Sequence, residues 1–155
     1  MTVNHTLYTA FLAAVPADLR WSYAETAREE DGSTAAPAAA AVWAWQNPHL
    51  LLALIATAAQ KAAVRGAEYA AARKGTAHAE ASANRTLTHL RRVGDLAEGL
   101  PTYGVWEGLA RRIAADAAIA SALVEGGKRR RAAEEVRALA AYAAGAADAC
   151  DFPRP

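Results

Sequence analysis

Alanine limits what this chain can fold into more than any other feature, since it fills 45 of the 155 positions. It has the highest helix propensity of all residues, because it loses no side-chain entropy when a helix forms. The residues that favour strands are sparse, and no strand-length stretch alternates apolar and polar side chains. The sequence therefore predicts an all-α protein.

Prolines and glycines divide the chain into segments of helical length, because both residues end helices. The expected helices are two or three short N-terminal ones within 3–15, 17–29 and 38–46, and four long ones over 48–74, 77–98, 103–125 and 128–149. Short loops between long helices favour an antiparallel bundle. We expect residues 1–150 to form a single domain and 151–155 to be a loose C-terminal tail.

Small residues dominate the face that the long helices would turn to the core. The expected stripe over 48–74 is Leu51, Ile55, Ala58, Ala62, Gly66 and Tyr69, and that over 77–98 is Ala83, Leu87, Leu90, Gly94 and Ala97. Small residues let helices approach to the short end of the usual separation of about 8–10 Å. The sequence thus predicts thin alanine-lined seams, with Leu51, Ile113 and Leu139 in the core.

Charge, cysteine content and hydropathy limit the location and the partners. A net charge of +1 gives no strong field toward polyanions, and the lone Cys150 cannot form an internal disulfide. The N-terminal apolar stretch has no lysine or arginine before Arg20, unlike a secretory signal. The uncharged run from Leu50 ends at Lys61, well short of the roughly 20 residues that a membrane span needs. We expect a soluble cytoplasmic protein without a membrane partner.

The sequence Trp-Gln-Asn-Pro-His marks a corner between two helices, where Asn47 fits the N-cap and Pro48 the first helical position. Trp43 and Trp45 precede this corner and point roughly 200° apart around a helix, so at least one of them reaches a second surface. The candidate aromatic site consists of Trp43, Trp45, His49 and Trp106. These residues could fill the core, line a small-ligand pocket or form a partner surface, since tryptophan is enriched at interface centres.

A basic turn, Lys128, Arg129, Arg130 and Arg131, follows two glycines and opens the last expected helix. Positive charges at a helix N-terminus oppose the helix dipole, so this turn is a candidate anion site. The alternative is a solvated turn that Glu134 and Glu135 partly neutralise. Nucleic-acid binding takes several phosphate contacts at once, so it would require that the fold gather further arginines on the same face.

The six residues from Arg73 to His78 fit the pattern Arg-x-x-x-x-His. The string resembles the motif of the HEPN family, small all-helical domains of which many are metal-independent ribonucleases that act as dimers. The resemblance implies that Arg73 would stabilise phosphate charge and that His78 would perform acid–base chemistry at a dimer cleft. It covers these six residues and the fold class.

Patterns for other chemistry are absent from the sequence. It has no Glu-x-x-His or His-Glu-x-x-His ligand spacing and no glycine-rich phosphate loop, so we expect no metal and no cofactor. The function predicted first is that of a small non-enzymatic interaction or assembly protein that self-associates, because thin seams bury little area and make a partner useful. The alternatives are a protein that acts on or binds nucleic acid, and a small-ligand pocket at the aromatic site.

Overall fold

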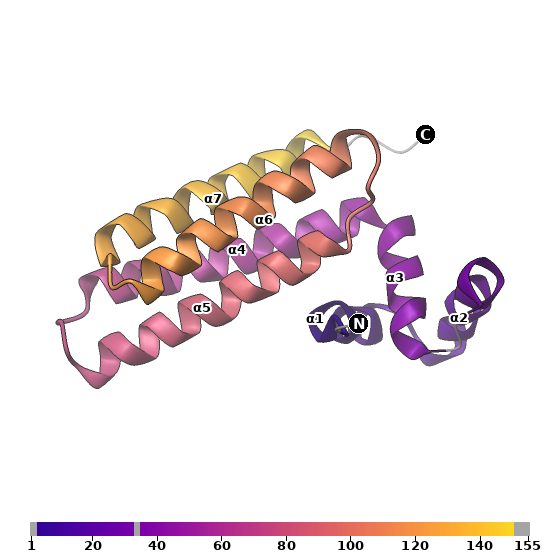
Figure 1. Ribbon diagram of the computed structural model, residues 1–155, viewed down its shortest axis with the longest axis horizontal. Coiled ribbons are helices and arrows are strands. Elements are labelled where there is room, and N and C mark those ends of the chain that lie inside the picture. Colours follow the sequence, from indigo (N-terminus) through magenta and orange to yellow (C-terminus); the bar gives the residue numbers. More distant parts are fainter. Residues whose placement is uncertain (1–2, 33–34, 151–155) are drawn as a thin grey trace.

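The computed structural model describes residues 3–32 and 35–150, which form seven helices and no strand (Figure 1). The helices are α1 (His5–Ala14), α2 (Ala17–Asp31), α3 (Ala36–Gln46), α4 (Pro48–Ala71), α5 (Ala77–Glu98), α6 (Gly104–Glu125) and α7 (Arg129–Ala149). The all-α prediction is confirmed. The predicted tail over 151–155 lies outside the described residues.

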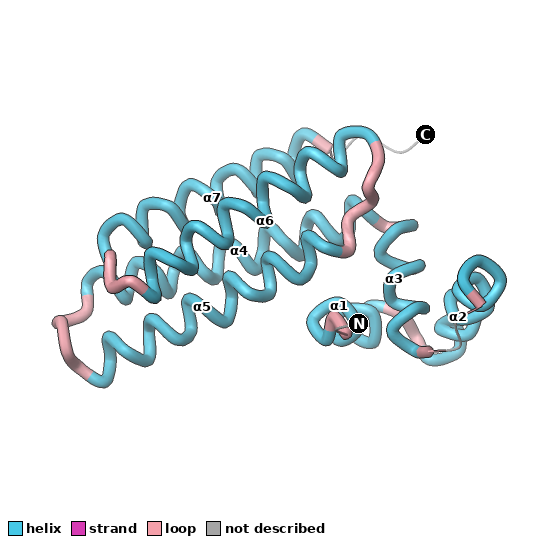
Figure 2. The backbone as a smooth tube through the Cα atoms, in the orientation of Figure 1, coloured by secondary structure: helices cyan, strands magenta, loops and turns pink. Residues whose placement is uncertain are grey.

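The four long helices form the antiparallel bundle that the short loops predicted. α4 packs against α5 and α7, and α6 packs against the same two helices, so the four surround one core. Figure 2 shows the connecting loops at alternating ends of the bundle. Leu51, Ile113 and Leu139 are fully buried in the core, as expected.

Small residues hold the bundle helices close together. Ala59 and Ala62 of α4 are fully buried. Gly66 lies between α5 and α7, where an added Cβ would be 3.8 Å from Thr86 and 3.8 Å from Val136. The backbone of α4 therefore approaches both neighbours in the way that the thin-seam prediction requires.

The N-terminal helices form an arm beside one end of the bundle (Figure 1). α1 packs on α3 and α5, whereas α2 packs chiefly on α3. Two hydrogen bonds tie α1 to α5: Asn4 Nδ2 donates to the backbone carbonyl of Asp95, and Thr6 Oγ1 donates to the Asp95 carboxylate, both at 2.7 Å. Leu7 also packs on Gly99 so closely that a Cβ added there would lie 2.9 Å from Leu7 Cδ1.

The core face of α5 differs from the predicted stripe. Its buried residues are Ala79, Ser82, Thr86, Leu90, Val93, Leu96 and Ala97, whereas Ala83, Leu87 and Gly94 are only partly buried. The predicted stripe contained no side chain with a hydroxyl group. Thr86 Oγ1 instead donates to the Ser82 carbonyl of its own helix at 2.7 Å, which satisfies the hydroxyl and makes its burial tolerable.

The predicted start of α4 is confirmed, with Asn47 at the N-cap position and Pro48 as the first helical residue. The Asn47 side chain makes no capping hydrogen bond to α4, however; its Nδ2 donates to the Trp43 carbonyl at 2.8 Å and so satisfies a free acceptor at the end of α3. α4 ends at Ala71 rather than near residue 74. The backbone becomes extended at Ala72 and then takes a positive φ of 80° at Gly75.

α4 is, among the described helices, the one whose length and composition would allow it to cross a membrane. In the bundle it is a core helix, with Leu51, Leu52 and Ile55 fully buried, and 39% of its most apolar window is buried. Core helices pass the same test of length and composition. The expectation of a protein without a membrane partner stays a prediction.

Replacing Ser82 by alanine is expected to stabilise the fold. The Ser82 hydroxyl is buried without a hydrogen-bond partner, and such a group costs about 1–3 kcal/mol. Alanine removes that cost and has the higher helix propensity. Urea unfolding should give a free energy of unfolding about 1 kcal/mol higher for Ser82→Ala than for the wild type.

Ser121→Ala is the matched control for this prediction. Ser121 is a half-buried serine within α6 and is not among the buried unpartnered groups. Its replacement should leave only the small helix-propensity difference. A loss of stability in Ser82→Ala would contradict the prediction and place a hydrogen-bond partner at that hydroxyl.

Candidate functional site

The aromatic site is split between two surfaces. Trp45 contacts Tyr103 at a ring separation of 5.4 Å, and His49 meets Trp106 edge-on at 4.9 Å. Both pairs join the α3–α4 corner to the start of α6. Trp106 is buried, but Trp45 is 46% exposed and lines a small cavity with Glu30 of α2.

Trp43 does not join the other three residues. Its ring is buried and packs on Phe11 of α1 at 5.9 Å, and Phe11 in turn meets Tyr23 of α2 at 5.8 Å. Trp43 and Trp45 therefore face different surroundings, as their spacing of two residues predicted. Trp43 belongs to the core that holds the arm, so the partner-surface hypothesis now rests on Trp45.

The basic turn contains one arginine with a clear structural partner. Arg129 is half-buried, and its Nη1 donates to the Ala72 carbonyl and, at 3.4 Å, to the Tyr69 carbonyl. These oxygens lie at the C-terminus of α4, the negative end of that helix dipole, where a cation is favourable. Arg129 therefore lies at the negative end of the α4 dipole, which accounts for a positive charge at the start of α7.

The rest of the basic turn faces solvent. Arg130 pairs with Glu134 one turn along α7 at 3.6 Å, and Lys128 and Arg131 are exposed. Arg73 and His78 are exposed too. Arg73 lies in the α4–α5 loop and His78 in the first turn of α5, and neither side chain makes a hydrogen bond or ion pair within the described residues. The nucleic-acid alternatives stay predictions, with no contact that favours them.

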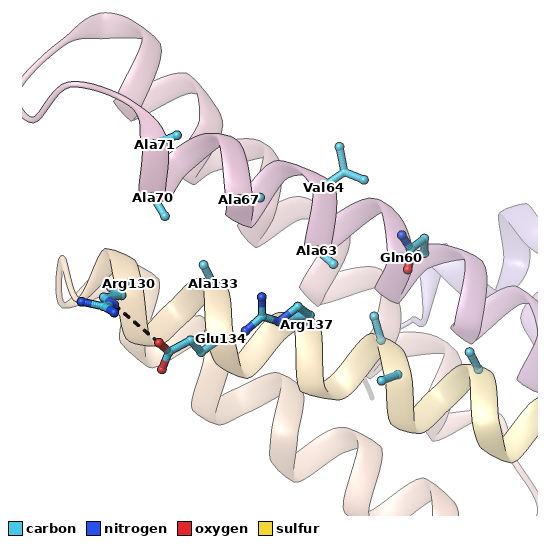
Figure 3. Close-up of a pocket in the computed structure, with 13 residues that line it drawn as sticks. Gln60, Ala63, Val64, Ala67, Ala70, Ala71, Arg130, Ala133, Glu134 and Arg137 are labelled. Carbon is cyan, nitrogen blue, oxygen red and sulfur yellow. Dashed lines mark ion pairs between the residues drawn. The ribbon is translucent and has the colours of Figure 1, made fainter.

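A groove of about 870 Å³ runs between α4 and α7 (Figure 3). Its lining is mostly alanine: Ala63, Ala67, Ala70, Ala71, Ala133, Ala140, Ala141 and Ala144, with Gln60 and Val64. Arg130, Glu134 and Arg137 lie along its α7 side. Arg137 is exposed and has no ion-pair partner among the described residues. The groove thus combines a methyl-lined floor with a basic edge.

A second cleft, of about 460 Å³, lies between α1, α4 and α5. Its basic lining residues are Lys61, Arg92, His5 and His89. The sequence alone assigned no site to Lys61 or His89. The residues come from three helices that are distant in sequence, so no local motif signals the cleft.

His89 lies half-buried beside this cleft. Burial, then the positive charges of Arg92, Lys61 and Arg65, lowers the pKa of His89 below its ordinary value of 6.5. Its Nδ1 is also buried without a hydrogen-bond partner. Three positively charged side chains therefore face His89 beside the cleft.

The described residues contain no group of three or more His, Cys, Asp or Glu side chains placed to hold a metal ion. No family model, curated protein or solved structure matches the chain.

Truncating Arg129 should destabilise the bundle. Arg129→Ala removes a charged donor from the carbonyls at the end of α4, and hydrogen bonds to charged groups contribute about 1.5–3 kcal/mol. Partial exposure reduces this, so we expect a loss of about 1 kcal/mol in the free energy of unfolding. Arg131→Ala, at an exposed position of the same turn, is the control and should leave stability unchanged. Equal effects of the two substitutions would contradict the capping role.

The lowered pKa of His89 predicts that mild acid weakens the fold. The unfolded chain has the higher pKa, so it takes up a proton first as the pH falls below about 6.5. The free energy of unfolding should therefore keep its full value above that pH. It should decrease as the pH falls from there to the pKa of His89 in the folded state. The charged groups facing the imidazole are Lys61 and Arg65 on α4 and Arg92 on α5, with the titratable His5 on α1 across the cleft.

Urea unfolding at about pH 7.5 and about pH 5.5 measures this effect. His89→Gln should reduce the difference in stability between the two conditions. His78→Gln removes an exposed histidine from the same helix and should preserve that difference. An unchanged pH dependence in His89→Gln would show that other groups cause it.

Proposed function

We propose that this chain is a non-enzymatic interaction and assembly protein that self-associates, with α2 of one copy bound in the α4–α7 groove of another. The observation that carries the proposal is the exposure of bulky apolar residues on α2. Leu19 is 54% exposed and Trp21 is 66% exposed, although α2 already packs on α3. The two residues are two positions apart and therefore point roughly 200° apart around α2, so they lie on different faces of the helix. A partner that covers the face with Leu19 would remove exposed apolar surface from water.

The groove offers a place for such a residue. Its floor of alanine methyl groups lets another helix approach closely, and a large side chain such as Leu19 fills space that small ones leave open. All the residues that line the groove belong to α4 or α7, so no third helix of the described chain covers it. A bulky residue on α2 and a small-residue groove therefore suit a helix-in-groove contact.

Charge supports the same pairing. α2 exposes the carboxylates of Asp18, Glu29 and Glu30. Its Arg20 is already used, because Nε and Nη2 donate to the carbonyls of Val15 and Leu12 at 2.9 Å. The groove is basic at its edge through Arg137. An acidic helix and a basic-edged groove attract each other, which favours a second copy of this chain as the occupant.

The test is sedimentation or light scattering over a concentration series. Leu19→Asp on the helix and Ala67→Glu in the groove should each reduce self-association by about tenfold or more, because each places a charge in the apolar contact. Both positions are exposed or at the groove surface, so the monomer should keep its fold.

Matched controls lie on α6. Ile119→Asp changes an apolar residue that is 51% exposed, and Ala118→Glu changes an exposed alanine. Both should leave association unchanged. A wild-type chain that stays monomeric at all concentrations would refute the proposal. Association that survives both Leu19→Asp and Ala67→Glu would refute the helix-in-groove contact.

A further inference from the structure

The cleft between α1, α4 and α5 is a second site with its own chemistry. All three helices contribute to its lining. The residues that matter for binding are Thr9 of α1, Leu54 and Lys61 of α4, and His89, Arg92 and Leu96 of α5. Its volume of about 460 Å³ lies within the usual range for small-molecule sites, about 300–1,000 Å³. The cleft is distinct from the groove between α4 and α7, with which it shares no lining residue.

The cleft collects positive charge that forms no ion pair with the described residues. Lys61 and Arg92 both line it, and neither makes an ion pair with a described carboxylate. No Asp or Glu is among its lining residues. The nearby Asp95 carboxylate accepts a hydrogen bond from Thr6, which fixes α1 against α5. Two uncompensated cations from different helices that line one concave surface attract an anion.

The remaining lining separates into donors and an apolar part. The hydroxyl of Thr57 donates to the Ala53 carbonyl at 3.1 Å, whereas the Thr9 hydroxyl has no partner within the described residues and is free to donate. His89 is half-buried beside these groups. Leu54, Leu96 and neighbouring alanines offer apolar contact within the same cleft. The lining therefore suits a ligand with a charged head and a short hydrocarbon portion.

We propose that this cleft binds a small organic phosphate monoester. Lys61 and Arg92 contact the dianionic phosphate, Thr9 donates a hydrogen bond to it, and Leu54 and Leu96 pack on the organic portion. A phosphate monoester carries close to two negative charges at neutral pH, which matches two cations better than a carboxylate does. Arginine and lysine are the side chains that proteins use most for phosphate recognition.

Isothermal titration of the full chain with butyl phosphate, at low ionic strength, tests the proposal. Saturable binding of one molecule per chain is expected. Lys61→Gln and Arg92→Gln should each weaken binding by about tenfold, the effect of losing one charge-assisted contact. The matched controls are Lys74→Gln and Arg91→Gln, which change exposed cations outside the cleft and should leave the affinity unchanged.

Two further probes separate the head from the tail. Inorganic phosphate should bind more weakly than butyl phosphate because it lacks the apolar portion, and butyrate should bind more weakly because it has a single charge. Butyrate that binds as tightly as butyl phosphate would overturn the assignment of a phosphate. No saturable binding of butyl phosphate, or equal losses in the Arg91→Gln and Arg92→Gln variants, would overturn the site.

The result is independent of self-association. Leu19 lies on α2, which contributes no residue to the cleft, so Leu19→Asp should bind butyl phosphate as the wild type does. Circular dichroism of each variant establishes that the helices are retained. Loss of binding in Leu19→Asp would show that the cleft depends on the assembled form.

Discussion

The close approach of α4 to both α5 and α7 is the constraint on which the rest of the structure depends. A Cβ added at Gly66 would be in ordinary van der Waals contact with both neighbours, and Ala59 and Ala62 are fully buried, so small side chains fill these contacts. Bulky residues are therefore displaced toward the end of the bundle where the arm attaches. Phe11, Trp43 and Trp106 pack there and form the junction between the bundle and the arm. The alanine content thus determines both how closely the bundle helices approach and at which end the bulky side chains gather.

The end of the bundle where the arm attaches carries two different surfaces. α1 is fixed to α5 and forms one wall of the cleft between α1, α4 and α5, whereas α2 packs chiefly on α3 and exposes bulky residues to solvent. The regular part of the bundle contributes the alanine groove. The molecule therefore carries two concave surfaces of different chemistry, one with unpaired cations and one with a floor of methyl groups.

Sequence patterns predicted the helices because each is bounded by local signals, such as Pro48 and Gly126, that act within a few residues. They failed on the core face of α5, since Thr86 satisfies its hydroxyl within its own helix and can be buried at little cost. They also could not assign a partner to Arg129, because the Ala72 carbonyl that it contacts is 57 residues away in the sequence. The cleft between α1, α4 and α5 was missed for the same reason, because Lys61 and His89 are distant in the sequence and only the fold brings their helices together.

Gly99, just after the end of α5, allows α1 to pack close to the bundle. A Cβ added at this position would lie 2.9 Å from Leu7 Cδ1 and 3.1 Å from Leu51 Cδ2, so these side chains would have to shift to admit one. Glycine therefore lets Leu7 pack directly over the backbone at the end of α5. The same helix carries Thr9 and His5 into the wall of the cleft between α1, α4 and α5, so the seat of Leu7 on this glycine helps to position that wall.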